Sequence, residues 1–301
     1  MITAAMVKEL RERTGAGMVD CKNALTESSG DIERAVEILR EKGMAALSKK
    51  AGRVASEGIS YAQVENGMGI VLEVNSETDF VAKNAEFTQF VADVAKQIAG
   101  SSSTTAEQLL TEKWHLDTNT TVEDVLAQKT ALIGEKLSIR RFEKYATQNT
   151  VVTYIHAGGK VAVMVELAAP DVPATQEAGK NLAMQIAAMN PRFVDRSQVS
   201  AEYIEKEKEI LTQQAIAEGK PANIVEKMTE GRLNKNLKEI CLIDQEYVKD
   251  GDLTINQYLE TVSKEVGSKV SVVRFVRYET GEGIEKKEEN FAEEVAKTMQ
   301  G

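Results

Sequence analysis

The chain has very few of the residues that bind metals or form disulfides. Its 301 residues include two cysteines, two histidines and one tryptophan. Cys21 and Cys241 lie far apart in the sequence, so they give no disulfide framework and are expected to be the reduced thiols of a cytosolic protein. His115 and His156 have no cysteine or histidine neighbours at a zinc-binding spacing. The composition therefore argues against a disulfide-rich secreted domain and against a zinc protein.

Other absences narrow the function further. No apolar run approaches the roughly 20 residues of a membrane helix, and the N-terminus has no signal-peptide pattern. No glycine-rich Walker loop is present. A net charge of -10 disfavours non-specific binding to nucleic acid, which depends on lysine and arginine. We expect a cytoplasmic protein that uses no cofactor and binds neither membranes nor nucleic acid.

The first 55 residues predict three short helices. Thr3 is a plausible N-cap for the first, and Gly15-Ala16-Gly17 separates it from a second helix over Met18 to Glu27. Asp31 begins a third helix, with Gly43 just past its end. Three short helices resemble a ubiquitin-associated-type module. A basic connector over Met44 to Arg53 is expected to follow.

The middle of the chain mixes strands and helices, which predicts an α+β fold. Strands are expected over Ile59 to Glu65, Gly69 to Val74 and Leu137 to Tyr145, with an Asn66-Gly67 turn between the first two. Helices are expected along the apolar stripe from Phe87 to Ile98 and over Val122 to Lys136. Residues 101–105 are expected to form a loop.

This strand-and-helix unit occurs twice. Tyr61 and Glu73 recur 93 positions later as Tyr154 and Glu166. The closing strand Ser138 to Phe142 recurs 133 positions later, so the second copy would carry an insertion of about 40 residues. We interpret this recurrence as a duplicated unit built on antiparallel strands, and the alternative is that the two segments align by chance.

The insertion itself is visible as a helical pattern. Val199 to Lys238 predicts two amphipathic helices joined at Gly219-Lys220-Pro221, which is a helical hairpin that should project and pack on something else. A further short helix is expected over Gly281 to Gly301, with Phe291 and Val295 on one face. The expected domains are 1–54 (helical module), 55–146 (first core unit), 147–198 with 236–279 (second core unit), 199–235 (helical hairpin) and 280–301 (C-terminal module).

Functional residues concentrate at the corner Thr78-Asp79-Phe80-Val81, where a strand gives way to a helix. An acid beside an aromatic on a protruding corner is typical of a group that opens a partner. A metal site at Glu73, Glu77 and Asp79 is a weak alternative, because carboxylates at strand ends are mostly solvated. His156 is either a surface histidine near a turn or a binding contact.

Several distinctive motifs run in order along the chain: Leu10 to Met18, Asp20-Cys21-Lys22, Glu73 to Ala82, Tyr154-Ile155-His156, Met189-Asn190-Pro191 and Gly281 to Ile284. With these motifs the sequence resembles the elongation factor Ts family, whose members are nucleotide exchange factors for the translational GTPase elongation factor Tu. Residues 101–121, including Trp114, match least. The resemblance implies an exchange factor that disturbs the magnesium and phosphate site of elongation factor Tu and speeds GDP release.

The resemblance also implies which residues meet the GTPase. Thr78, Asp79, Phe80 and Val81 would enter near its magnesium site, and the other implied contacts are Arg11, Met18, Val19, Lys22, Lys50, Ile133, Gly134, His156 and Val248. Val19 replaces a common methionine, and Ala157 replaces a common glycine beside His156. The helical hairpin could form a homodimer.

Two other classes of function stay open at this point. A passive adaptor would bind a partner through the helical module alone and would leave GDP release unchanged. An enzyme could use Glu77 and Asp79 as an acid and base, although no pocket signal accompanies them.

Overall fold

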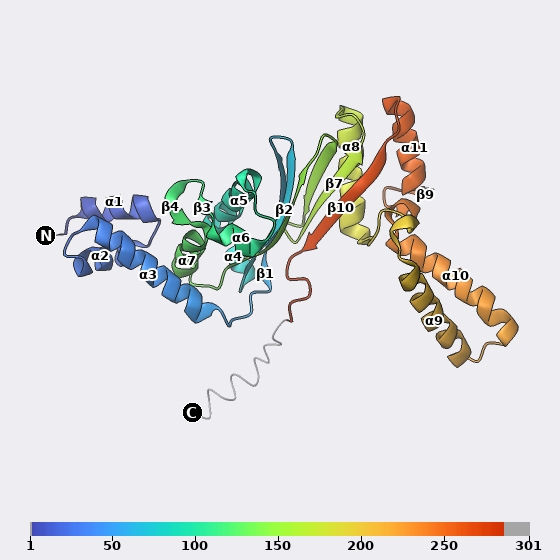
Figure 1. Cartoon of the computed structure of the whole chain (residues 1–301), viewed down its shortest axis with the longest axis horizontal. Helices are drawn as coiled ribbons and strands as arrows, with labels where there is room; N and C mark the ends of the chain where they lie inside the picture. Colours follow the sequence, from blue (N-terminus) through green and yellow to red (C-terminus); the bar gives the residue numbers. More distant parts are fainter. Residues whose placement is uncertain (1, 286–301) are drawn as a thin grey trace. The chain divides into compact units, whose positions relative to one another are not determined.

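The computed structural model describes residues 2–285, so the predicted C-terminal helix with Phe291 and Val295 lies outside the described residues. The chain divides into two compact units. The first includes the chain up to residue 61, residues 72–142 and the segment from 279 onward, and the second includes 62–71 and 143–278. Both mix helices with sheets, so the predicted α+β class is confirmed (Figure 1). Within the described part, no helix is both long and apolar enough to cross a membrane.

The first unit begins with three helices: α1 (Ala4–Thr14), α2 (Met18–Glu27) and α3 (Ile32–Lys50). The Thr3 side chain accepts a hydrogen bond from the N–H of Met6 and caps α1, and the Asp31 side chain accepts one from the N–H of Arg34 and caps α3. Gly15 ends α1 in the left-handed conformation, with φ 67°. The three helices share a small buried core: Val7, Leu10, Cys21, Ala24, Leu25, Ala35, Ile38 and Leu39.

The third helix is longer than predicted, and the expected connector from Met44 is helical as far as Lys50. The helix continues because Gly43, which was expected to follow its end, is a buried residue inside it. A Cβ on Gly43 would meet the backbone of Ala127 at 3.4 Å, so glycine allows α3 to pack closely on another helix, α7 (Val122–Ile133). Arg40 of α3 also binds the buried Asp124 of α7 at 2.7 Å. The helical module is therefore attached to the rest of the first unit.

The first unit also contains residues 57–61, 72–76 and 138–142 of a three-stranded sheet with strand order β1-β2-β5. The strands are β1 (Glu57–Glu65), β2 (Met68–Ser76) and β5 (Ser138–Ala146). Helix α5 (Ala85–Gly100) carries the predicted apolar stripe, with Phe87, Phe90, Val91, Val94 and Ile98 all buried. The segment between α5 and α7, which gave no clear pattern, forms α6 (Ala106–Thr111), β3 (Lys113–Trp114) and β4 (Asp117–Thr121).

The second unit repeats this arrangement, with strand order β10-β7-β6. Its elements are β6 (Thr150–His156), β7 (Val161–Ala168), α8 (Pro173–Met189), β8 (Glu246–Tyr247), β9 (Asp250–Thr254), α11 (Ile255–Val266) and β10 (Ser271–Glu279). Strands β6 and β7 pair antiparallel, with Tyr154 opposite Val163. Strands β6, β7 and β10 follow the same order as β1, β2 and β5, as the predicted duplication requires.

The two units also share their internal hydrogen bonds. The side chain of Gln97 on α5 donates to Glu112 at 3.1 Å and accepts the N–H of His115 at 2.8 Å. Gln185 on α8 makes the equivalent bonds with Gln245 at 3.1 Å and with the N–H of Val248 at 2.9 Å. The buried amide is thus satisfied in the same way in both units, and its partners Glu112 and His115 correspond to Gln245 and Val248.

The second unit contains the predicted insertion, formed by α9 (Ala201–Ala217) and α10 (Ala222–Ile240). In Figure 1 the two helices run side by side, joined by a short loop. Leu211, Ala215 and Val225 are buried between them, and Arg232 binds Glu218 across the pair at 2.8 Å. At the base of this helical hairpin lies a cluster of Val199, Leu237 and Cys241 with Phe193 and Tyr203.

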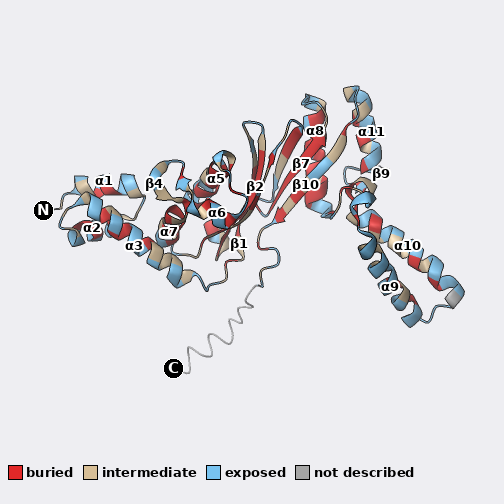
Figure 2. Ribbon diagram, in the orientation of Figure 1, coloured by how far each residue is buried: buried red, intermediate tan, exposed pale blue. Residues whose placement is uncertain are grey.

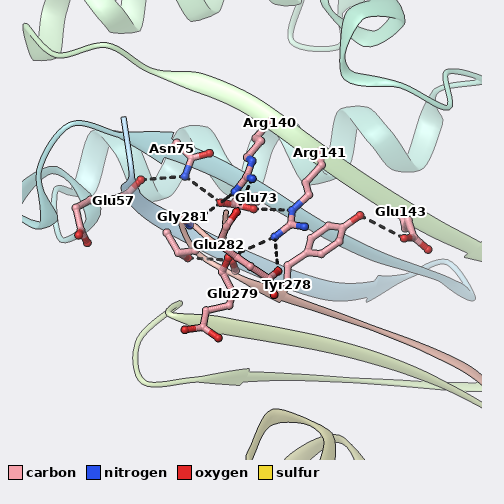
Figure 3. Close-up of polar contacts among 12 residues, drawn as sticks. Glu57, Glu73, Asn75, Arg140, Arg141, Glu143, Tyr278, Glu279, Gly281 and Glu282 are labelled. Carbon is pink, nitrogen blue, oxygen red and sulfur yellow. Dashed lines mark hydrogen bonds and ion pairs between the residues drawn. The ribbon is translucent and has the colours of Figure 1, made fainter. Parts of the chain in front are cut away.

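A buried carboxylate lies at the centre of the first sheet. Glu73 of β2 is completely buried and ion-paired to Arg140 at 2.9 Å and to Arg141 at 2.6 Å, both on β5 (Figure 3). It also accepts hydrogen bonds from the Asn75 side chain and the Gly281 N–H. Glycine is needed at 281, because its φ is 76° and a Cβ would collide with the carbonyl oxygen of Ser56. Glu73 thereby fixes the segment that follows β10.

The second unit has the same arrangement around Glu166. This buried carboxylate binds Arg274 of β10 at 2.6 Å and accepts hydrogen bonds from Thr147 and Asn149. Buried residues, coloured red in Figure 2, run along the strands of both sheets. Burial, the largest effect, raises the pKa of each glutamate, but the hydrogen bonds and arginines together outweigh it, so both pKa values are lowered.

These lowered pKa values predict acid sensitivity. The folded protein binds fewer protons than the unfolded chain, so the stabilisation is complete above the unfolded carboxyl pKa of about 4.3 and is lost as the pH falls through the lower folded value. We expect Glu73→Gln to lower the free energy of unfolding at pH 7 by up to about 3–5 kcal/mol, because it leaves two arginines without their buried partner. The variant should also lose stability less steeply below pH 5. Urea unfolding between pH 3 and 7 measures both effects.

The control is Glu33→Gln. Glu33 is exposed and pairs with Arg13 at 2.8 Å on the surface, where an ion pair contributes little. This variant should unfold at pH 7 like the unmodified protein. Equal losses in the two variants would contradict a special role of the buried carboxylate.

Candidate functional site

The most unusual feature of the first unit is the corner formed by Thr78 to Val81. Helix α4 (Asp79–Ala82) is a single turn that follows directly on β2. Phe80 is 78% exposed, which is more than any other large hydrophobic residue in the described part of the chain, whereas Val81 is 7% exposed. Asp79 forms an ion pair with Lys83 at 2.9 Å. Phe80 therefore does not belong to the core, and the aromatic core positions nearby are filled by Phe87 and Phe90.

Comparison of the repeats shows that this corner is an addition to the first unit. The hairpin residues recur at a spacing of 93, as in Glu73 and Glu166, but the long helices recur at 88, as in Gln97 and Gln185. The first unit thus has five more residues between its hairpin and its long helix. Those residues form the corner helix and its end.

The residues before Asp79 are bound to the loop that follows α7. The Glu135 carboxylate accepts hydrogen bonds from the N–H groups of Glu77 and Thr78 and from the Thr78 hydroxyl. Ile133 and Gly134, which precede Glu135, are therefore brought beside the corner. Gly134 ends α7 with φ 84°, and Ile133 is half-buried. Sequence reasoning missed Glu135, because a glutamate after a helix-ending glycine gives no signal of a partner 57 positions away.

A second exposed apolar surface lies on the helical module. Met18 is 61% exposed and Val19 is 71% exposed at the start of α2. A hollow of 370 Å³ beside them is lined by Ile2, Thr3, Ala4, Val7, Met18, Val19 and Lys22. Arg11 is exposed on α1, and Lys50 is half-buried at the end of α3. The surface combines apolar side chains with a cation, which suits a protein partner.

Two predicted contacts belong to the second unit. His156 is exposed at the end of β6, with its Nδ1 3.0 Å from the Tyr154 hydroxyl. Ala157 follows in the left-handed region with φ 48°, which glycine adopts more easily. Val248 is 49% exposed between β8 and β9, and its N–H is bound to Gln185.

The carboxylates of Glu73, Glu77 and Asp79, at and near the corner, are all paired with basic side chains. The Glu77 carboxylate accepts a hydrogen bond from the Lys136 N–H and pairs with Arg53 at 3.2 Å. Asp79 is paired with Lys83, and Glu73 with its two arginines. In the part of the chain that the structure describes, no group of three or more acidic, cysteine or histidine residues could hold a metal ion. What the corner offers is an exposed aromatic side chain beside a carboxylate on a fixed backbone.

Comparisons with known proteins agree with this architecture. The model of the family "Elongation factor TS" matches residues 77–282. The elongation factor Ts proteins of Clostridium perfringens (strain SM101 / Type A) and Clostridioides difficile (strain 630) are 56% and 54% identical to this chain over 301 residues, with 99% of each chain covered. That of Clostridium novyi (strain NT) is 54% identical over 303 residues, with the same coverage. The chain therefore belongs to the elongation factor Ts family.

Proposed function

We propose that this protein is a nucleotide exchange factor that binds elongation factor Tu and speeds GDP release during translation elongation. Membership of the family supports the partner. The observation that carries the mechanism is the exposure of Phe80 on an anchored corner, because a 78% exposed phenylalanine contributes little to its own fold. Such a side chain is available to fill a gap in a partner.

The mechanism follows from how a GTPase holds its nucleotide. Backbone N–H groups, a lysine and a magnesium ion bind the phosphates. Phe80 enters between helices of the GTPase near the magnesium site, and Asp79 presents a carboxylate to the groups that order the ion. The factor then binds the distorted, nucleotide-free state more tightly than the loaded state. By linkage, bound nucleotide weakens the factor by the same ratio. No covalent step is involved.

The remaining residues extend this contact. Arg11, Met18, Val19 and Lys22 of the helical module, which we regard as ubiquitin-associated-like, dock on the GTPase, with Lys50 supporting them. Ile133 and Gly134 lie beside the corner in the same unit. His156 and Val248 add contacts from the second unit. The helical hairpin provides a surface for a homodimer, with Ile210, Ile216 and Ile224 at 42%, 53% and 44% exposed.

Phe80→Ala should slow stimulated GDP release by roughly tens- to several-hundred-fold. Interface aromatics in a pocket lose about 2–4 kcal/mol on truncation, and about 1.4 kcal/mol is a factor of ten in rate. The free variant should melt like the unmodified protein, since exposed positions change stability little. Stopped-flow release of a fluorescent GDP, beside thermal melts, measures both. Asp79→Ala should have the same effect but smaller, because its charge is partly screened.

Phe87→Ala is the matched control. Phe87 is fully buried, so this variant should lose about 3–5 kcal/mol of stability and still stimulate release at a temperature where it is folded. If Phe80→Ala melted early and released GDP normally at low temperature, the proposed role of Phe80 would be wrong.

Met18→Ser combined with Val19→Ser should weaken the complex with nucleotide-free elongation factor Tu by at least about tenfold, the effect of losing one buried apolar anchor. Leu116→Ser is the control, because Leu116 is 65% exposed but lies outside the module. Titration calorimetry gives both dissociation constants. An unchanged dissociation constant in the double variant would contradict the proposal that the helical module contacts the GTPase.

Replacing residues 205–232 with a short Gly-Ser link should abolish self-association and leave most of the exchange activity. The link removes the buried contacts of Leu211, Ala215 and Val225 but keeps the cluster of Val199, Leu237 and Cys241 at the base. Light scattering after size exclusion measures the mass. A monomeric unmodified protein would contradict the homodimer. Loss of exchange activity in a variant that is still folded would indicate that the hairpin contacts the GTPase.

A further inference from the structure

Glu135 makes an unusually complete set of hydrogen bonds to the corner. Its Oε2 atom accepts the N–H of Thr78 at 2.9 Å and the N–H of Glu77 at 3.1 Å. Its Oε1 atom accepts the Thr78 hydroxyl at 2.6 Å. All three donors belong to the two residues that immediately precede Asp79 and Phe80. A carboxylate that accepts several N–H and O–H bonds is a strong acceptor, because the charge strengthens each bond.

The corner needs such an anchor, because little else in α4 can fix it. A helix of four residues is too short to be stable by itself. Thr78 stands at its N-cap, but the Thr78 side chain makes no capping bond to α4 and is directed to Glu135. Within α4, Val81 is the buried residue, whereas Phe80 gains almost no packing.

A second set of bonds runs in the opposite direction. The Glu77 carboxylate accepts the N–H of Lys136, the residue after Glu135, and pairs with Arg53. The Lys136 ammonium donates to the carbonyl oxygens of Ala51 and Arg53. The end of β2, the loop after α7 and the segment after α3 are thereby joined around the corner.

The second repeat serves as an internal comparison. The corner lies among the five extra residues of the first unit, so Phe80 has no counterpart in the second repeat, where α8 begins at Pro173 soon after β7 ends at Ala168. At the spacing of 133, Glu135 corresponds to Ser268. The carboxylate is therefore present in the unit that has the corner and absent from the unit that lacks it. A residue needed only for the shared fold would not follow the corner in this way.

We propose that Glu135 is a positioning residue for nucleotide exchange. It fixes the backbone at Glu77 and Thr78, so that Asp79 and Phe80 are held in the orientation that enters the partner. The inference rests on the proposed function, because it concerns how the corner acts on elongation factor Tu. An anchored corner does not have to be ordered during binding, and preorganisation of this kind raises the rate of the step that follows.

The test combines Glu135→Ala with Phe80→Ala in a double-mutant cycle. Glu135→Ala alone should slow stimulated GDP release by about tenfold or more, the effect of misplacing a binding group by a small distance. In the Phe80→Ala background its further effect should be much smaller than in the unmodified protein, because only Asp79 is then left for Glu135 to position. Phe80→Ala should still release GDP faster than the unstimulated GTPase, so any further slowing in the double variant can be measured. Additive losses would overturn the proposal.

Two further variants and one spectroscopic measurement make the result specific. Glu135→Gln keeps one carbonyl acceptor and should restore part of the rate, whereas Thr78→Val should reproduce part of the loss. Ser268→Ala, at the equivalent position of the second repeat, should behave like the unmodified protein. Amide hydrogen exchange at Glu77 and Thr78, measured on the free protein, should accelerate at least tenfold in Glu135→Ala. Unchanged exchange rates at these amides would also overturn the anchoring role.

The two proposals fail in different ways. If the unmodified protein did not speed GDP release, the proposed function would be wrong, although the amide measurement would still report whether Glu135 anchors the corner. If release were stimulated normally by the unmodified protein and by Glu135→Ala, the exchange function would stand and the positioning role would be wrong. Thermal melts of each free variant separate either result from unfolding.

Discussion

The buried carboxylate of Glu73 is the interaction on which the first unit depends. Removing a carboxylate from water costs several kcal/mol, so the fold is stable only if every donor is in place. One of these donors is the N–H of Gly281, which lies 208 positions later in the chain. The first unit is therefore completed only after the whole second unit has been traversed. The buried carboxylate thus links β2 to the end of the described chain.

The shared interactions of the two repeats separate the scaffold from the proposed function. The Glu73 and Glu166 carboxylates and the Gln97 and Gln185 amides are satisfied alike in both units, so they maintain the fold. The differences are the corner helix α4 and the helical hairpin of α9 and α10. Duplication supplies two stable frames, and one frame can then carry an exposed phenylalanine without loss of its core. The corner that carries Phe80 and the helical hairpin proposed for the homodimer accordingly lie where the copies diverge.

Much of this was readable from the sequence, and the exceptions have physical causes. The recurrence of Glu73 as Glu166 predicted the duplication, because a buried ion pair requires the same residue in each copy. Gly43 was misread as a helix end, since sequence alone does not distinguish a glycine that ends a helix from one that admits a neighbouring helix. Strands β3 and β4 pair with a register shift, so they show no alternation of apolar residues. Glu135 depends on a contact made in space, which no local pattern contains.

In the proposed function, the anchoring of the corner decides whether Phe80 can bind a partner favourably. Burying the Phe80 ring completely in a partner gains about 1.5–3 kcal/mol. Ordering a mobile backbone costs about 1–2 kcal/mol for each residue. The helix α4 has four residues, so a mobile corner would lose more free energy on binding than its aromatic ring could supply. Hydrogen bonds formed within the free protein move that cost from binding to folding. In the proposed function, Phe80 can therefore bind the partner favourably only because the backbone beneath it is already fixed.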